Sequence, residues 1–303
     1  MRGLIIRSQS GFYTVETETG GVTCHLRGRL KQGKRLGDIV AVGDWVQVTT
    51  LPSGEGMIET VEPRQHLLSR MAPTPHGEYQ QILVANLDQA VFVFSCAMPT
   101  LRPGMLDRFL VVAEKQDIPV LIVANKVDLV GMTYAEELFS HYEPLGYPVI
   151  YTSAKSGVGI TEIAERLRGK LSVFAGPSGA GKSSLLNSIQ PGLGLAVRTI
   201  SQMTEKGKHT TVVRQLFRLE EGGYVADTPG LKAMALWDIQ TEELDGYFPE
   251  LRGLVDACQF SDCTHTHEPG CAVLAAVERG EVHPKRYASY VRMRLSQDEN
   301  DWY

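Results

Sequence analysis

The segment GPSGAGKSS, from Gly176 to Ser184, constrains the fold of this chain more than any other feature. It matches G-x-x-x-x-G-K-[ST] at every fixed position, follows the apolar run LSVFA and precedes the helical run LLNSI. A glycine-rich turn between a buried strand and a helix directs backbone N–H groups at phosphate oxygens. The segment therefore predicts a parallel α/β sheet that binds a nucleotide at one edge. The strand–loop–helix context argues against the alternative, a glycine-rich turn that matches by chance.

Two side chains of this phosphate loop have specific roles in such chemistry. Lys182 would reach the β- and γ-phosphates, and Ser183 would ligate Mg²⁺ bound with the nucleotide. The predicted phosphate-binding residues are Gly176, Pro177, Ser178, Gly179, Ala180, Gly181, Lys182, Ser183 and Ser184.

A second motif, NKVD, ends the apolar run PVLIVA at the strand edge where α/β sheets bind ligands. A carboxylate at Asp128 can accept hydrogen bonds from N1–H and the N2 amine of guanine, and adenine lacks this donor pair. The stem of Lys126 could lie along the ring. Alone, NKVD could be a polar strand-to-helix turn, but TSAK (152–155) ends the next strand, and its backbone could contact guanine O6. The predicted base-binding residues are Asn125, Lys126, Val127, Asp128, Ser153, Ala154 and Lys155.

Two segments downstream resemble the switches of a GTPase, GKHTT (207–211) and DTPG (227–230). Asp227 follows the strand YVA and would hold Mg²⁺ through a water, while the N–H of Gly230 would sense the γ-phosphate. Thr210 or Thr211 would add a second hydroxyl to Mg²⁺, and the sequence leaves open which of them does so.

The residue that orients the attacking water is less obvious. Leu231 follows DTPG, near the place where a Ras-like GTPase has a glutamine, and an aliphatic side chain cannot orient water. His209, in the first switch, is the nearest candidate by sequence. The alternative is a histidine that only packs or contacts RNA.

The order of these segments is unusual. An ordinary GTPase has its phosphate loop and switches first and its base motifs last, whereas here the base motifs come first. From about residue 82, apolar strand-like runs alternate with helical runs, which predicts parallel strands with helices on both faces. Residues 82–232 are therefore predicted to form a circularly permuted GTPase domain, a rearrangement that is tolerated when the old termini lie close together.

The segments on either side of this domain have a different pattern of apolar and polar residues. Residues 1–70 contain short alternating or β-branched runs, which predict a small β-barrel of the OB or SH3-like kind. Residues 71–81, with Pro and Gly, are expected to be a linker. Five cations fall in one stretch of the barrel, where they could follow a phosphate backbone or simply face solvent; they are Arg27, Arg29, Lys31, Lys34 and Arg35.

The C-terminal segment, 233–303, is predicted to be mainly helical around a metal site. Three thiols and an imidazole, Cys258, Cys263, His265 and Cys271, suit a closed structural Zn²⁺ site. On spacing alone, His267 competes with His265 as the fourth ligand. Reduced, buried cysteines are the alternative, which is difficult to reconcile with three thiols so close together.

The basic tail near the C-terminus, KRYASYVRMR (285–294), has two interpretations. It could be a helix that binds RNA through cations and stacking tyrosines. We expect instead a solvated helix face whose tyrosines pack inward.

Composition narrows the function classes. The net charge of −5 argues against a general nucleic-acid coat, so any contact with a polyanion must be local. The N-terminal stretch MRGLIIRSQSG has too short an apolar run for a signal peptide, so none is expected, and no apolar run approaches membrane-spanning length. Five cysteines, three of them clustered, suit a reducing compartment, so a cytoplasmic protein is expected. Nothing in the sequence indicates an obligate dimer, and we expect a monomer.

The motif order, with an N-terminal barrel and a C-terminal Cys/His cluster, closely resembles the RsgA (YjeQ/YloQ) family of circularly permuted GTPases over essentially the whole chain. The resemblance implies an OB-fold domain, a permuted GTPase domain and a zinc domain. It also implies a cytoplasmic GTPase that binds the small ribosomal subunit and its rRNA, assists late maturation and hydrolyses GTP to GDP under ribosomal stimulation. The family pattern favours His265 over His267. Members often have a third threonine in the first switch, where this chain has Val212, so that residue is given no role.

Two other functions are possible from the sequence. One is an RNA-binding module in which the nucleotide is only a structural ligand, and the two switch segments argue against it. The other is a P-loop ATPase, and Asp128 argues against that.

Overall fold

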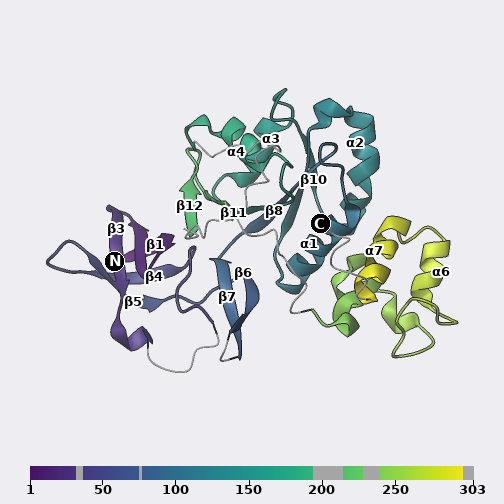
Figure 1. Ribbon diagram of the computed structural model, residues 1–303, viewed down its shortest axis with the longest axis horizontal. Coiled ribbons are helices and arrows are strands. Elements are labelled where there is room, and N and C mark those ends of the chain that lie inside the picture. Colours follow the sequence, from purple (N-terminus) through teal and green to yellow (C-terminus); the bar gives the residue numbers. More distant parts are fainter. Residues whose placement is uncertain (32–36, 75–76, 194–213, 228–238, 296–303) are drawn as a thin grey trace.

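The computed structural model describes residues 1–31, 37–74, 77–193, 214–227 and 239–295. Figure 1 shows three parts along the long axis: a β-rich N-terminal part, a central α/β part and a helical C-terminal part. The predicted multidomain architecture is confirmed in this respect. Among the described residues, no helix is both long enough and apolar enough to cross a membrane.

The N-terminal part is the predicted small barrel, built from five strands. They lie in the order β1-β2-β3-β5-β4, and pairing of β1 with β4 closes the barrel. Alternate side chains point inward, so that Ile5, Val15, Val46 and Ile58 form its core. The elements are β1 (Arg2–Gln9), β2 (Phe12–Thr17), β3 (Gly20–Leu26), η1 (Gly28–Lys31), β4 (Trp45–Thr50) and β5 (Gly56–Val61).

The cation-rich stretch of the barrel is partly neutralised within the chain. Arg27 donates to Glu59 Oε1 at 2.6 Å, and Arg29 donates to Glu59 Oε2 at 3.2 Å. Lys34 and Arg35 lie outside the described residues.

The stretch expected to be a linker, 71–81, lies largely in a β-hairpin. Strands β6 (Leu67–Thr74) and β7 (Gly77–Ala85) pair antiparallel along their whole length. The Pro and Gly residues that suggested a linker lie toward the end of this hairpin. A hairpin uses the same turn residues as a linker, which explains why composition alone did not distinguish the two.

The central part is a sheet with helices on both faces, as predicted. Its strand order is β10-β9-β8-β11-β13-β12, parallel except for the antiparallel edge strand β12. Its core includes Phe109 and Phe139 on one face and Ile163 and Leu185 on the other. The strands are β8 (Gln89–Ser95), β9 (Val120–Asn125), β10 (Val149–Thr152), β11 (Leu171–Ala175), β12 (Arg214–Arg218) and β13 (Tyr224–Asp227). The helices are α1 (Pro103–Lys115), η2 (Val127–Leu129), α2 (Met132–Phe139), η3 (Ser140–Leu145), α3 (Ile160–Leu167), α4 (Lys182–Ile189) and η4 (Pro191–Leu193).

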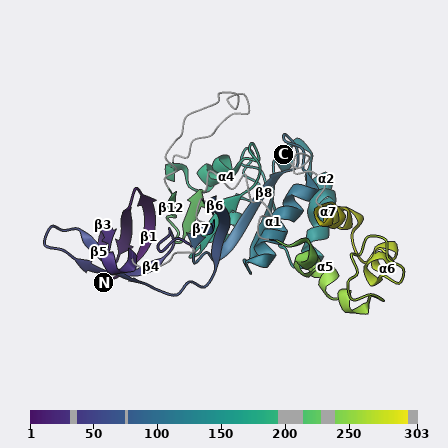
Figure 2. The ribbon, with the colours of Figure 1, turned by 60° about the horizontal axis from the view of Figure 1, so that its bottom comes forward.

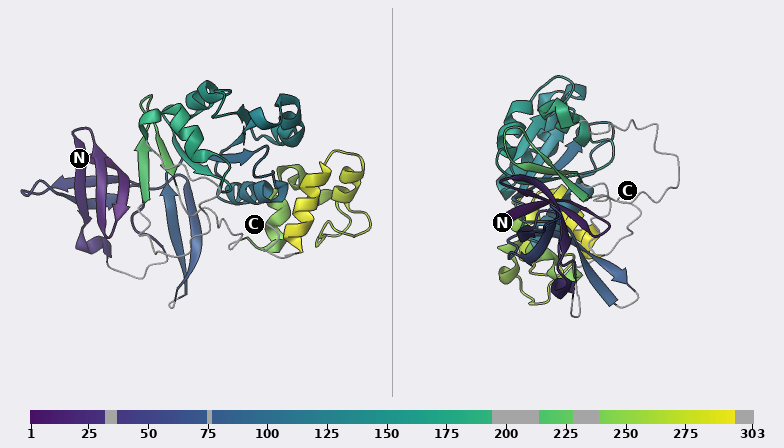
Figure 3. Two further views of the ribbon diagram at one scale, coloured as in Figure 1. Left: turned by 45° about the horizontal axis from the view of Figure 1, so that its top comes forward. Right: turned by 90° about the vertical axis from the view of Figure 1, so that its left-hand side faces the viewer.

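Strand β12 joins the barrel to the central sheet. It pairs antiparallel with β1, with Arg7 opposite Gln215, so that one 11-stranded sheet runs through both parts. In Figure 2, β12 lies beside β1, and Figure 3 shows the green strands between the purple barrel and the remaining sheet. Leu4 of the barrel and Leu216 of β12 belong to one buried cluster. No motif or apolar run in the sequence predicted this pairing of β1 with β12.

The C-terminal part is a set of short helices against α1. They are η7 (Thr241–Tyr247), α5 (Pro249–Arg252), η8 (Val255–Ala257), α6 (Ala272–Glu278) and α7 (Pro284–Arg294). As expected, Tyr290 of α7 packs inward. Arg286 was expected on a solvated face but is fully buried, where it donates to Asp107 Oδ1 of α1 and to Glu250 Oε1, both at 2.7 Å. Two carboxylates within reach explain how this cation is accommodated without solvent.

Candidate nucleotide and metal sites

The predicted nucleotide-binding segments meet at one edge of the central sheet. Strands β8, β9, β10, β11 and β13 are parallel, so their carboxyl ends lie at the same edge. NKVD follows β9, TSAK follows β10 and the phosphate loop follows β11. This is the usual position of a ligand site in an open α/β sheet.

Two positions of the phosphate loop require glycine, because each combines a positive φ with a close neighbouring atom. Gly176 has φ +138°, and a Cβ there would lie 2.1 Å from the carbonyl oxygen of Val93. Gly181 has φ +95°, and its Cβ would lie 2.4 Å from Asn125 Nδ2. Lys182 begins α4, and its Nζ donates to the carbonyl oxygens of Gly176 at 2.7 Å and Pro177 at 2.9 Å. The lysine head is thus held inside the loop that would surround a phosphate.

Asn125 connects the base motif to the phosphate loop. Its side chain is buried, and Nδ2 donates to the carbonyl oxygen of Ala180 at 2.8 Å. Its Oδ1 accepts from Thr152 Oγ1, at the end of β10, at 3.1 Å. One amide therefore fixes three strand ends relative to one another.

Asp128 is oriented by the second base loop. Ser153 Oγ donates to Asp128 Oδ1 at 2.6 Å and accepts from the backbone N–H of Ser156 at 3.1 Å. This chain of hydrogen bonds restrains the carboxylate of Asp128 in one orientation.

Lys126 adopts a left-handed backbone conformation with φ +66°. Its Nζ donates to the carbonyl oxygen of Met98, in the segment after β8. Burial lowers the pKa of Lys126, although the Asp128 carboxylate opposes this shift.

These segments enclose one cleft of about 390 Å³, which we call the base cleft. Its lining joins the base motif, the second base loop and α4. Sequence reasoning missed two of its residues, Leu129 and Ser188. Ser188 Oγ donates to the carbonyl oxygens of Ala154 at 3.3 Å and Ser184 at 2.9 Å, which ties α4 to the second base loop. The lining residues are Asn125, Lys126, Asp128, Leu129, Ala154, Lys155, Gly181, Ser184 and Ser188.

The switch residues are described only in part. Asp227 is the last residue of β13, opposite Phe174 of β11, one strand from the phosphate loop. His209, Thr210, Thr211 and Gly230 lie outside the described residues.

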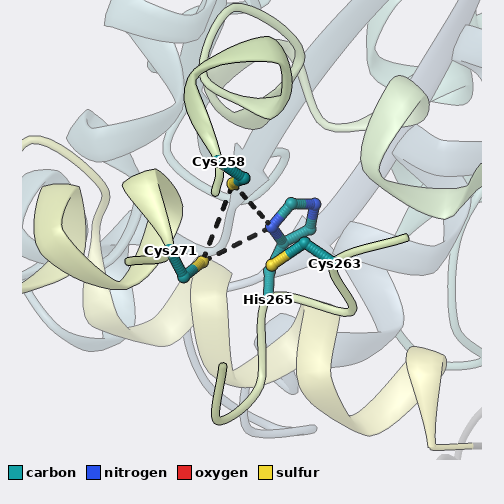
Figure 4. A group of neighbouring side chains, drawn as sticks. All are labelled: Cys258, Cys263, His265 and Cys271. Atoms are coloured by element: carbon teal, nitrogen blue, oxygen red, sulfur yellow. Dashed lines mark hydrogen bonds between the residues drawn. The ribbon is translucent and has the colours of Figure 1, made fainter. Parts of the chain in front are cut away.

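The C-terminal Cys/His residues form one cluster, shown in Figure 4. The ligand atoms of Cys258, Cys263, His265 and Cys271 all lie within 4.8 Å of one another. His265 Nδ1 lies 3.5 Å from both Cys258 Sγ and Cys271 Sγ, and these two sulfurs are 4.0 Å apart. Zn–S bonds of about 2.3 Å in a tetrahedron place the ligand atoms at such separations. The donor set therefore fits one zinc ion.

The surroundings of His265 select which ring nitrogen faces the cluster. Its Nε2 lies 3.2 Å from Asp245 Oδ2 and can donate a hydrogen bond to that carboxylate. Nδ1 is then unprotonated, and its lone pair points into the space between the three sulfurs. Asp245 gave no signal in the sequence because it lies 20 residues from His265. His267 is exposed and bonds to Thr266 Oγ1, outside the cluster.

Burial also affects the protonation of one thiol of the cluster, that of Cys263. Burial is the main cause that raises the pKa of Cys263 to about 12. A bound divalent ion reverses this effect, because it stabilises the thiolate directly.

The sequence matches two models of known protein families. A sequence model described as RsgA GTPase matches residues 61–237, and one described as RsgA N-terminal domain matches residues 2–58. The chain belongs to the RsgA GTPase family. Relatives named "Small ribosomal subunit biogenesis GTPase RsgA" include those of Gemmatimonas aurantiaca, 43% identical over 96% of each chain, and Thermotoga maritima, 43% identical over 96% of this chain and 95% of that one.

Two solved structures share the RsgA fold. YjeQ from Thermotoga maritima has a TM-score of 0.78 and 41% identity, with 97% of each chain covered. YloQ, described as a circularly permuted GTPase, has a TM-score of 0.73 and 34% identity, with 97% of this chain and 94% of that one covered. The family resemblance and the permutation predicted from motif order are confirmed.

Proposed function

We propose that this RsgA family member binds GTP in the base cleft and on the phosphate loop, hydrolyses it to GDP and phosphate, and acts in biogenesis of the small ribosomal subunit. The observation that supports this most strongly is the base cleft itself. Two base motifs and a phosphate loop line one cavity, and Asn125 hydrogen-bonds across it. The names of the relatives supply the ribosomal role.

In this proposal, each segment contacts a different part of GTP. Asp128 accepts from N1–H and N2 of guanine, Lys126 and the backbone at Val127 border the ring, and 153–155 contact O6. Residues 176–184 surround the phosphates, with Lys182 at the β- and γ-phosphates and the N–H of Gly230 at the γ-phosphate.

Mg²⁺ would be held next to the phosphate loop. Ser183 follows Lys182 in the first turn of α4, and Asp227 ends the strand beside β11, which supports their proposed role at a phosphate-bound cation. Thr210 or Thr211 would supply a further hydroxyl. When bound, Mg²⁺ neutralises charge that develops on the phosphates.

The C-terminal cluster would hold one structural zinc ion. Cys258, Cys263, His265 and Cys271 fill all four positions of a tetrahedron, which leaves no open position for chemistry. Zinc would therefore stabilise the fold of this part of the chain, not hydrolysis.

We also propose that the protein acts in the cytoplasm as a monomer and contacts small-subunit rRNA. The central experiment measures GTP and ATP turnover with and without purified small subunits. GTP turnover that rises with subunits is expected. Subunits that bind without any GTP turnover would favour an RNA-binding module, and equal use of ATP would favour an ATPase.

His209 is the proposed water-orienting residue, on the basis of chain order alone. For His209→Ala, we expect unchanged GTP affinity and a loss of subunit-stimulated turnover of about 100-fold, because general acid–base or orienting groups contribute about that much. Binding of the variant to subunits, measured by co-sedimentation, is the control. Undiminished stimulated turnover would rule out this role.

A further inference from the structure

The hairpin formed by β12 and β13 lies between the barrel and the phosphate-loop strand. β13 pairs with β11 on one side, and β12 pairs with β1 on the other. β12 begins directly after the segment that holds the first switch, and β13 ends at Asp227. In the chain, this hairpin therefore lies between the two segments predicted to be switches.

One barrel carboxylate contacts both strands of the hairpin. Glu16 of β2 accepts from Arg218 Nη1 of β12 at 2.9 Å and from the hydroxyl of Tyr224 of β13. Arg218 and Tyr224 lie opposite each other in the hairpin. Since β1 lies between β2 and β12, Glu16 bonds to the hairpin from the strand beyond its direct neighbour.

The two partners of Glu16 differ in their exposure to water. The Glu16 side chain is 23% exposed and that of Arg218 is 69% exposed, whereas burial together with the bond to Glu16 raises the pKa of Tyr224 to about 12. The hydroxyl of Tyr224 thus stays a hydrogen-bond donor throughout the physiological range. Glu16 also borders a cleft of about 350 Å³, so a smaller side chain there need not disturb the packed barrel core.

A second contact supports the same joint. Arg214, the first residue of β12, donates to the carbonyl oxygen of Ile82 at 2.8 Å and lies 3.6 Å from Asp38 Oδ2. Asp38 in turn accepts from the backbone N–H of Ile82 at 2.9 Å. Both ends of β12 are therefore held by groups that lie outside the central sheet.

We propose that Glu16 is a positioning residue for GTP hydrolysis, which rests on the proposed function above. By holding Arg218 and Tyr224, the barrel reinforces the β11–β13 pairing that sets the position of Asp227 relative to the phosphate loop. Loss of Glu16 leaves the base cleft intact, because none of the residues that line it belongs to the hairpin. The barrel thus contributes to the chemistry of a site that it does not touch.

The test compares Glu16→Ala with Glu18→Ala, which removes an exposed carboxylate two residues further along the same β-hairpin. For Glu16→Ala, we expect kcat for GTP to fall about fivefold, as for loss of an ion pair whose arginine is largely exposed, with KM for GTP changed less than about twofold. The Mg²⁺ concentration for half-maximal turnover should rise. Glu16→Gln, which can still bond to both partners, should recover part of kcat, and Tyr224→Phe should reproduce part of the defect. A kcat and Mg²⁺ dependence equal to those of Glu18→Ala would overturn the proposal.

A second readout does not depend on turnover. In the nucleotide-free protein, amide hydrogen exchange in 214–218 and 224–227 should be faster in Glu16→Ala than in Glu18→Ala. Equal exchange would overturn the positioning role even if the wild type hydrolyses GTP. Faster exchange in a protein without GTP turnover would support the positioning of the hairpin while contradicting the proposed function.

Discussion

At Asn125, one buried amide holds the NKVD motif against the phosphate loop. Its partners, the Ala180 carbonyl and the Thr152 hydroxyl, come from two other strand ends. Asp128 is held in the same way by Ser153. Groups fixed in this way lose little conformational freedom on binding, which favours affinity.

Asp128→Asn tests guanine selectivity. Replacing the charged acceptor should weaken GTP binding by about 1–3 kcal/mol, because hydrogen bonds to a charged group are lost. Affinity can be measured by titration with a fluorescent GTP analogue and competing ATP. Glu137→Gln, which removes an exposed carboxylate of α2, is the matched control. A wild type that binds GTP and ATP equally would contradict the assignment.

At this scale, a site residue could be predicted only where a local sequence motif contains it. Asn125, Asp128 and Lys182 belong to motifs whose backbone shape is local, and these motifs meet at the expected edge of the sheet. Ser188 and Asp245 act through side chains that meet their partners only after helices pack. No spacing rule in the sequence marks such residues, so they could not have been predicted.

At the scale of elements, η3 meets the start of α7 through two stacked imidazoles. The rings of His141 and His283 lie 4.1 Å apart with an interplanar angle of 15°. Burial, and then the neighbouring His283, lower the pKa of His141 from 6.5 to about 4. The stack therefore packs as two neutral rings near pH 7.

His141 makes stability depend on pH in a defined window. Between about pH 6.5 and 4 the unfolded state binds a proton that folded His141 does not, so the free energy of unfolding falls as pH falls through that window. Allowing for partial solvent screening, we expect a loss of about 1 kcal/mol at pH 5 relative to pH 7 from this group. Urea unfolding of wild type and His141→Gln at both pH values measures the difference, with His25→Gln on the barrel as control. An identical pH dependence in all three proteins would contradict this expectation.

The Cys258/Cys263/His265/Cys271 cluster is supported by an element that contributes no member to it, since Asp245, which bonds to His265, belongs to η7. Asp245→Asn keeps an acceptor but removes the charge that favours metal-bound His265. We expect zinc affinity to fall about tenfold, the lower end for such a partner. Competition with a chelator measures this, with Cys258→Ser as the reference for a lost ligand and Glu242→Gln as the neutral control. Zinc retention equal to that of Glu242→Gln would count against the role of Asp245.

Elements with a strong periodic pattern were predicted well, and pairings between distant strands were not. Strands β9 and β11 can be recognised in the sequence from their mostly apolar runs, VLIVA and LSVFA. The β6–β7 hairpin mixes polar residues, Pro and Gly, and therefore resembled a linker. The pairing of Arg7 with Gln215 depends on how the barrel docks, which a local pattern does not encode.

Across the whole molecule, a buried ionic group connects the central and C-terminal parts. Arg286 of α7 is 1% exposed and contacts Asp107 of α1 and Glu250, which are 0% and 5% exposed. Tyr142 adds a hydrogen bond to Asp107 at 2.9 Å. A charge pair of this kind specifies one docking geometry, because any shift leaves a buried charge unpaired.

Arg286→Met should separate these two parts. It removes the guanidinium and leaves two buried carboxylates, a change expected to cost about 3–5 kcal/mol. Urea unfolding followed by limited proteolysis would show release of the C-terminal helices at lower denaturant. Lys285→Met, at an exposed position of the same helix, is the control. Equal stability of the two variants would show that the ion pair does not hold this interface.

The joint between β1 and β12 also has a consequence for protein synthesis. β1 leaves the ribosome well before the strand that covers its edge, because Gln215 of β12, which pairs with Arg7, is made about 200 residues later. At common translation rates that interval is about 10–40 s. Throughout it, the half of β1 around Arg7 is an open strand edge, the kind of surface that pairs with other nascent chains. Newly made barrels should therefore be prone to aggregate until β12 emerges and pairs with this edge.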